Sequence, residues 1–195
     1  TVASHVWTSP VANLEAADLS YAVLSGANFS SAHLGRTDFS GGAQLQGTNF
    51  LLASMQGADL SGAMLFLADF SSAQMQAVLL SHADLHGALL RDADLEGADL
   101  GNAKLQGADL SRARLTAADL RDAAVWMSSP GADEALGLAD LSQIVVKPLD
   151  AMEVARLKGS IDKIVAGPLQ SQMREGLAGI MNIALEGFML IGAFM

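Results

Sequence analysis

The sequence contains no cysteine among its 195 residues. Disulfide bonds, thiolate metal sites and cysteine nucleophiles are therefore excluded. Aromatic residues are also scarce, at 5% of the sequence, although hydrophobic residues reach 51%. A core with so few large rings must be built mainly from Ala, Leu and Met. This composition favours a narrow and repetitive interior.

Positive charge is the next scarce feature. The 11 Lys and Arg residues face 21 Asp and Glu residues, which gives a net charge of −10. We therefore expect no direct nucleic-acid binding through phosphate contacts. The sequence also lacks a Ser/His/Asp set and a Gly-rich phosphate loop. We expect no catalytic residue, no cofactor and no metal, and hence no enzyme activity.

One short segment alternates two histidines with a carboxylate, at His82, Asp84 and His86. In an extended chain these three side chains point to the same side, and such side chains can bind a metal. When such a pattern lies on a solvent-exposed surface, it usually binds no metal. We interpret all three as outward-pointing surface side chains.

Apolar residues recur every five positions through residues 12–127. The series starts at Leu14 and, after one extra residue at Gly41-Gly42, continues to Val125. We call the members of this series the core residues. An Ala lies two positions before nearly all of them, and the exceptions are Thr37, Thr48 and Val78.

The step of five positions distinguishes a helix from a strand. Five residues of α-helix turn through about 500°, so the core residues would spiral around a helix and form no common face. In an extended chain, each Ala points to the same side as the core residue two positions later, but a flat strand sends the next core residue to the opposite side. The chain must therefore turn a corner in every repeat. Repeated corners produce a β-solenoid whose layers are about 4.8 Å apart.

The unit A-(D/N)-L-x-x, as in Ala58-Asp59-Leu60, resembles the bacterial pentapeptide-repeat proteins. The resemblance implies a mainly β fold, a right-handed quadrilateral β-helix with four repeats in each coil. With this coil length, Phe29, Phe50 and Phe70 fall into one interior column. The extra residue at Gly41-Gly42 is then a one-residue bulge that keeps the core residues inside.

Both ends of the repeat region carry a Trp followed closely by a Pro, at Trp7-Thr8-Ser9-Pro10 and at Trp126-Met127-Ser128-Ser129-Pro130. Open ends of a β-solenoid expose unpaired backbone groups, so they need a cover. We expect each Trp to cover one end of the core column, and each Pro to stop further strand pairing.

After the repeats, the period of five disappears and a helical pattern begins. Asp150 and Glu153 form a D-x-x-E capping signal, apolar residues then recur at helical spacing, and Gly167-Pro168 ends this first helix. A second helix is predicted from about Leu169. The predicted organisation is an N-terminal cap at 1–11, the β-helix at 12–127, a linker or cap at 128–149 and an α-helical tail of two helices at 150–195.

The last part of the tail is almost uncharged: from Leu177 to Met195 only Glu186 carries a charge. One alternative, which the family resemblance favours, is a homodimer through the C-terminal helices or packing of the tail on the solenoid. The other is membrane association of residues 177–195, whose length approaches that of a membrane span. The predicted dimer or tail contacts are Met173, Leu177, Ile180 and Phe188.

The outward positions decide what the solenoid contacts, because the core residues and alanines point inward. The residue before each core residue is mostly Asp or Asn. These side chains either hydrogen-bond the backbone at the corners or form acidic ladders that fit a basic groove. The candidate binding residues on one side are Asp18, Asp38, Asp59, Asp99 and Asp119.

A second candidate surface is apolar and includes Met64, Phe66 and Leu67 at outward positions. Exposed apolar residues in a cluster often mark a contact surface. We expect either a protein partner or the tail of the chain itself to cover them. On the next side of the coil, this group is joined by Leu51, Leu52 and Leu89.

Together these features favour a non-enzymatic protein-interaction or assembly scaffold in the cytoplasm. The alternative location is as a membrane-associated domain of a longer bacterial protein, which a looser resemblance to pentapeptide-repeat domains of bacterial membrane proteins suggests. The alternative function implied by the family resemblance is a DNA mimic that binds and protects the topoisomerase gyrase.

Overall fold

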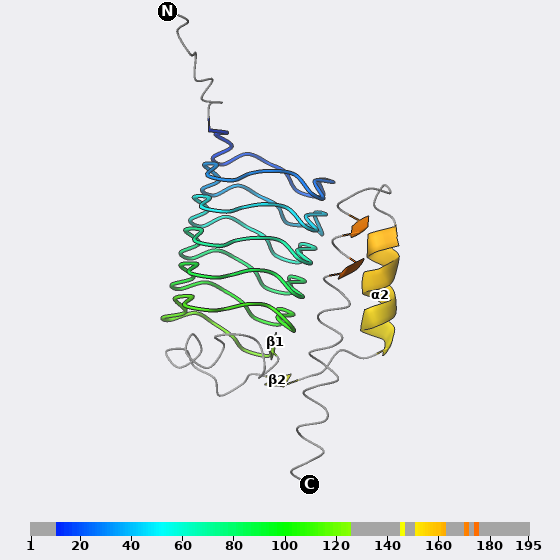
Figure 1. The fold of residues 1–195 in the computed structure, drawn as a ribbon. Helices are drawn as coiled ribbons and strands as arrows, with labels where there is room; N and C mark the ends of the chain where they lie inside the picture. The colour runs from blue at the N-terminus through cyan, green and yellow to red at the C-terminus, as the bar shows by residue number, and fades with distance from the viewer. Residues whose placement is uncertain (1–10, 126–144, 147–150, 163–169, 172–173, 176–195) are drawn as a thin grey trace, which may run out of the picture.

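A computed structural model of the chain describes residues 11–125, 145–146, 151–162, 170–171 and 174–175. Within these ranges, residues 11–125 form a stack of coils, and the helix α2 (Ala151–Asp162) lies along one side of the stack (Figure 1). Residues 170–171 and 174–175 also have helical backbones. At the end of the stack, the short strands β1 (Ala124–Val125) and β2 (Val145–Val146) pair in parallel.

Adjacent coils are joined by single parallel bridges. Asp18 bridges to Asp38, which is four repeats later in the chain. The next bridge joins Val23 to Gln44, which lies one position further along because the extra residue at Gly41-Gly42 intervenes. Each complete coil has four such bridges, so its cross-section has four sides. The coil of four repeats and the one-residue bulge are therefore both confirmed.

The bridging residues precede the core residues and form one column on each side of the stack. Each column, together with the outward residue two positions after each of its members, defines a face. The columns are those of the aspartate face (Asp18, Asp38, Asp59, Leu79, Asp99 and Asp119), the helix-bound face (Val23, Gln44, Met64, Asp84, Lys104 and Ala124), the asparagine face (Asn28, Asn49, Asp69, Leu89 and Asp109) and the ladder face (Asn13, His33, Ser54, Gln74, Asp94 and Arg114).

A tight turn makes each corner of the coil. In the first repeat, the Ala17 N–H donates to the Leu14 carbonyl at 2.9 Å, and Ala16 between them has a φ of 56°. A positive φ at the third residue is the signature of a type II turn, which favours Gly there. The bulge needs two such residues, because both Gly41 and Gly42 have positive φ, of 72° and 81°.

The core residues and the alanines fill the interior, and three phenylalanines stack in it as expected. The rings of Phe50 and Phe70 are 4.8 Å apart and inclined by 3°, and those of Phe29 and Phe50 are 5.5 Å apart. Phe39 contacts both Phe29 and Phe50 edge to face. Stacked and edge-to-face rings are both favourable arrangements, so one column holds the widest side chains of successive coils.

The two threonines that replace Ala are explained by hydrogen bonds across the coils. Thr37 Oγ1 donates to the Leu14 carbonyl at 2.8 Å, and Thr48 Oγ1 donates to the Leu24 carbonyl at 3.0 Å. Both threonines are completely buried. A buried hydroxyl needs a partner, and the carbonyl of the preceding coil supplies it.

Two expectations for the ends lie outside the described residues, because these exclude Trp7 and Trp126. The described strand β2 lies within the segment expected to be a linker or cap. Val145 and Val146 pair with Ala124 and Val125 of the last described coil, so β2 continues the stack.

Phe50 tests how much the aromatic column stabilises the solenoid. We expect Phe50→Ala to lower the free energy of unfolding by about 3–5 kcal/mol, because it removes a fully buried ring from between Phe29 and Phe70. Phe29→Ala should cost less, because Phe29 is only partly buried. Urea denaturation followed by circular dichroism measures both. Equal losses for the two variants would contradict this account of the column.

Candidate interaction surfaces

The aspartate face carries the five carboxylates that the sequence singled out as candidate binding residues. In each of them, Oδ1 accepts a hydrogen bond of 2.8–3.0 Å from the backbone N–H two residues later. Asn28 and Asn49 on the asparagine face accept the same bond. These Asx turns hold each side chain against its own corner. The backbone-bonding interpretation of the Asp and Asn positions is therefore confirmed, and one oxygen of each carboxylate is fixed by it.

The unbalanced negative charge of this face lies toward its N-terminal end. At the other end, Arg121 pairs with Asp119, with Nε 2.8 Å from Oδ2. Asp18, Asp38 and Asp59 make no ion pair with any residue that the structure describes. Their position in one bridged column places three negative charges in a straight row on successive coils.

The remaining arginines of the solenoid pair with carboxylates one coil away. Arg112, for example, binds Asp92 through Nε and Nη2, at 2.6 and 2.7 Å. Ion pairs at the surface add little to stability, but these pairs neutralise acidic side chains, mostly in the later coils. The pairs are Arg36–Glu15, Arg91–Asp109, Arg112–Asp92, Arg114–Asp94 and Arg114–Glu96.

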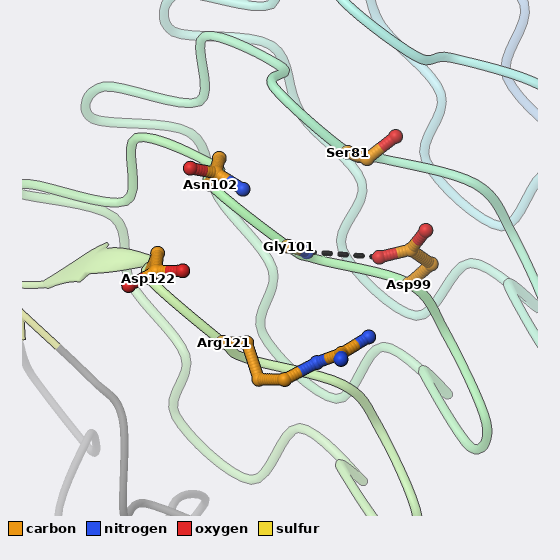
Figure 2. A pocket seen from close by; sticks show the side chains of 6 residues that line it. All are labelled: Ser81, Asp99, Gly101, Asn102, Arg121 and Asp122. Carbon is orange, nitrogen blue, oxygen red and sulfur yellow. Dashed lines mark hydrogen bonds between the residues drawn. The ribbon is translucent and has the colours of Figure 1, made fainter.

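A polar pocket on the aspartate face lies where a row of outward serines is interrupted. The hydroxyls of Ser61 and Ser81 are 3.3 Å apart, and the same position one coil later is Gly101. Because Gly101 has no side chain, a hollow of about 350 Å³ opens beside Asp99, which accepts the Gly101 N–H at 2.9 Å (Figure 2). The sequence pointed to Asp99 but not to the pocket, whose only signal is the glycine in the serine row. The pocket is lined by Ser81, Asp99, Gly101, Asn102, Arg121 and Asp122.

The expected apolar patch on the helix-bound face is largely covered. Phe66 is only 1% exposed, and Met64 and Leu67 are half-buried, so these residues are covered within the chain, which is one of the two alternatives that the sequence left open. The helix α2 lies against this side of the stack (Figure 1), where Arg156 Nη2 is 2.6 Å from Asp84 Oδ2. The outward residues of the middle coils on this face are therefore wholly or partly shielded in the folded chain, and the tail of the chain contributes to this cover, whereas Val23 in the first coil is 70% exposed.

The second apolar group, on the asparagine face, is different. Leu51 and Leu52 are exposed, at 36% and 57%, whereas Leu89 is half-buried. Two exposed leucines are too few to define a contact surface, because single surface hydrophobics are common in soluble proteins.

The expectation that His82, Asp84 and His86 all point into solvent is wrong for two of them. His82 is exposed, but Asp84 is 7% exposed and His86 is completely buried. The reason is that Asp84 and His86 lie on the helix-bound face, where Arg156 of α2 approaches. No group of three or more His, Cys, Asp or Glu residues is placed to hold a metal within the described part of the chain.

Asp84 is the buried centre of a charged cluster that reaches the surface at Arg156. One of its oxygens is hydrogen-bonded to His86 Nδ1, and the other to the guanidinium of Arg156. Burial raises the pKa of Asp84, but the hydrogen bonds and charges of His86 and Arg156 outweigh burial and lower the pKa to about 2. The carboxylate is therefore ionised at neutral pH and tethers α2 to the solenoid.

The predicted tail contacts Met173, Leu177, Ile180 and Phe188 all lie outside the described residues. The same is true of residues 177–195, for which membrane association is the alternative. None of the helices within the described residues is both long enough and apolar enough to cross a membrane.

The lowered pKa of Asp84 predicts how the tether responds to acid. Because the folded pKa is about 2 and the ordinary value is 3.8, its stabilisation is complete above about pH 4 and is lost as pH falls toward 2. We expect Asp84→Asn to lower the free energy of unfolding by about 2 kcal/mol at pH 5, and this difference to shrink toward zero at pH 2. Urea denaturation at several pH values measures it. A difference that is the same at pH 5 and pH 2 would show that the ionised carboxylate does not hold the helix.

Several solved structures are similar to this chain. Among solved structures, a pentapeptide repeat protein of the cyanobacterium Cyanothece is 24% identical over 62% of this chain and 88% of its own, with a TM-score of 0.44. A pentapeptide repeat protein of the Arabidopsis thaliana thylakoid lumen is 24% identical over 80% of this chain and 87% of its own, with a TM-score of 0.33. QnrB1, a plasmid-mediated fluoroquinolone resistance protein, is 23% identical over 77% of this chain and 75% of its own, with a TM-score of 0.35.

No curated protein matches the chain. The model of the pentapeptide repeat family matches eight copies, in residues 12–41, 42–71, 68–107 and 93–125, which together exceed half of the chain. The matched residues are those of the stacked coils. The chain therefore belongs to the pentapeptide repeat family, and its coils form the right-handed β-helix of that family.

Proposed function

We propose that the chain is a non-enzymatic protein-interaction scaffold and that the aspartate face is its partner-contact surface. The observation that carries this proposal is the row of Asp18, Asp38 and Asp59, which lie in one bridged column and have no cation beside them among the described residues. Their Asx bonds fix the side chains before any partner arrives. A surface that is ordered in advance loses little conformational entropy on binding.

The chemistry of this row indicates a partner with a basic surface. Charges on successive coils are about 4.8 Å apart, so a row of Lys or Arg side chains on a strand or a groove wall can face them. Opposite charges arranged in this way mainly set the association rate and the specificity of a complex. The long flat faces of a solenoid suit such contacts, as in other stacked repeat proteins.

Replacement of the three aspartates by Asn separates charge from structure. Asn28 and Asn49 already make the same backbone bond in this chain, so Asp18→Asn, Asp38→Asn and Asp59→Asn together should leave stability nearly unchanged. We expect the triple variant to bind protein partners at least about tenfold more weakly, which corresponds to about 1.4 kcal/mol. Crosslinking capture from a bacterial extract, quantified against the parent chain, measures this change.

A control removes three charges outside the aspartate face, through Asp69→Asn, Asp92→Asn and Asp94→Asn, of which Asp92 and Asp94 are paired with Arg112 and Arg114. It should retain the partners that the first variant loses. Equal capture by the parent chain and both variants would contradict a contact through the aspartate face. Equal loss in both variants would show that only net charge matters.

A second candidate function is a DNA mimic that binds and protects gyrase, and the same acidic row favours it. A mimic predicts gyrase binding that weakens steeply with salt, because the charges involved are exposed. The triple Asn variant should lose that binding. Absence of binding to purified gyrase at low salt would contradict this candidate while leaving the scaffold proposal intact.

We further propose that the chain is a cytoplasmic homodimer through residues 150–195, with membrane association through residues 177–195 as the alternative. The apolar pattern at Met173, Leu177, Ile180 and Phe188 supports it. Ile180→Asp with Phe188→Asp should convert a dimer into a monomer, because each buries a charge in an apolar contact. Light-scattering mass after size exclusion measures this. An unchanged dimer mass rules out these contacts, and a chain that requires detergent favours the membrane alternative.

A further inference from the structure

The helix-bound face differs from the other three faces in the burial of its outward side chains. The outward residue just after the core residue is exposed or half-buried on the other faces. On the helix-bound face, four such residues on successive coils are each at most 4% exposed. They are Gln46, Phe66, His86 and Gln106.

Three of these buried residues are polar, and two of them have unused hydrogen-bonding groups. Gln46 is satisfied, because its Oε1 accepts from the Ser25 hydroxyl at 2.7 Å and its Nε2 lies 3.5 Å from Met64 Sδ. His86 Nε2 has no hydrogen-bond partner, and neither does the Nε2 or the Oε1 of Gln106, in the structure as described. Buried polar atoms normally have partners, so this face carries recognition groups that the folded chain leaves unused.

The contact of α2 with this face includes an ion pair and a buried apolar side chain. Arg156 pairs with Asp84, and Leu157 is 1% exposed. By contrast, Met152 is 81% exposed, and Ala155 and Lys158 are exposed. Among the side chains of α2 that the structure describes, the contact with this face is therefore made by Arg156 and Leu157.

We propose that the helix-bound face is a docking site for an arginine-bearing amphipathic helix of another protein, and that α2 occupies this site until the partner displaces it. The partner's guanidinium replaces Arg156 on Asp84. A side-chain amide or hydroxyl of the partner bonds His86 Nε2 and the Gln106 amide. The proposal rests on the scaffold function, and it adds a second surface and the chemistry of its partner.

The unused polar atoms favour another protein over a second copy of this chain. A second copy would bring the same α2 with the same Arg156. It would therefore leave His86 Nε2 and the Gln106 amide unpaired, as the chain's own helix does. A different helix that supplies those hydrogen bonds gains contacts that no copy of α2 makes, and this difference is what allows displacement.

The test uses the full chain and a fluorescent peptide with the sequence of residues 150–163. In the Arg156→Glu variant, repulsion from Asp84 should vacate the site. We expect this variant to bind the peptide at least tenfold more tightly than the parent chain does, measured by fluorescence anisotropy. The peptide carrying Arg156→Gln should bind at least tenfold more weakly. No binding to the vacated variant, or binding that does not depend on the peptide's Arg156, would overturn the proposal.

Two further peptides test whether a better-fitting helix exists. Positions 153 and 160 lie three before and four after Arg156, on the same side of a helix. We expect Glu153→Gln or Ser160→Gln in the peptide to bind at least threefold more tightly than the parent peptide, through the unpaired atoms of His86 and Gln106. If neither does, the idea of a better partner helix is wrong.

Two controls distinguish this proposal from binding at the aspartate face and from dimerisation. The Asp18→Asn, Asp38→Asn and Asp59→Asn chain should bind the peptide as the parent chain does, so failure of the aspartate face and failure of this site are distinguishable. Light scattering checks the second copy. A dimer that becomes a monomer on Arg156→Glu alone would assign the site to another copy of the chain and overturn the partner proposed here.

Discussion

A corner in every repeat is the constraint on which this protein depends. Each corner except the bulge is closed by a hydrogen bond from an N–H to the carbonyl of the core residue three positions earlier, and it needs a residue of positive φ before that N–H. Glycine meets this requirement at many corners, but Tyr21, Leu52 and other side chains adopt the same backbone. Their positive φ angles are strained, but the fold requires them, because a single missing corner would turn every later core residue outward.

The same corner also determines the chemistry of the surface. An Asp or Asn before the core residue bonds the backbone of its own turn, so structure alone explains why carboxylates recur on the aspartate face. On the aspartate face, the charge of a carboxylate is available to a partner where no arginine lies beside it, at Asp18, Asp38 and Asp59. On the helix-bound face, the two carboxylate oxygens of Asp84 instead bond the side chains of His86 and Arg156. Recognition in this protein therefore uses positions that the fold already needs.

The repeat region could be predicted from the sequence, but the cover of its helix-bound face by α2 could not. The core positions, the bulge and the phenylalanine column follow from a period of five, because each depends on neighbours at fixed separations along the chain. The burial of Phe66, Asp84 and His86 depends on the approach of α2, which comes after the whole repeat region and which no local pattern near these residues encodes. The pocket beside Gly101 could not be predicted for a related reason, because its lining residues come from three successive coils and are far apart in the sequence.

The most direct measurement of the central constraint is the stability of two single-residue deletions. Deletion of Gly42 removes the bulge and leaves Gly41, whose φ is already 72°, at an ordinary corner. We expect this variant to unfold cooperatively, with a free energy of unfolding within about 1 kcal/mol of that of the parent chain. Deletion of Gly62 shifts every later core residue by one position and should abolish cooperative unfolding. Equal tolerance of both deletions, or collapse of the fold in both, would contradict the claim that the five-residue register holds this protein together.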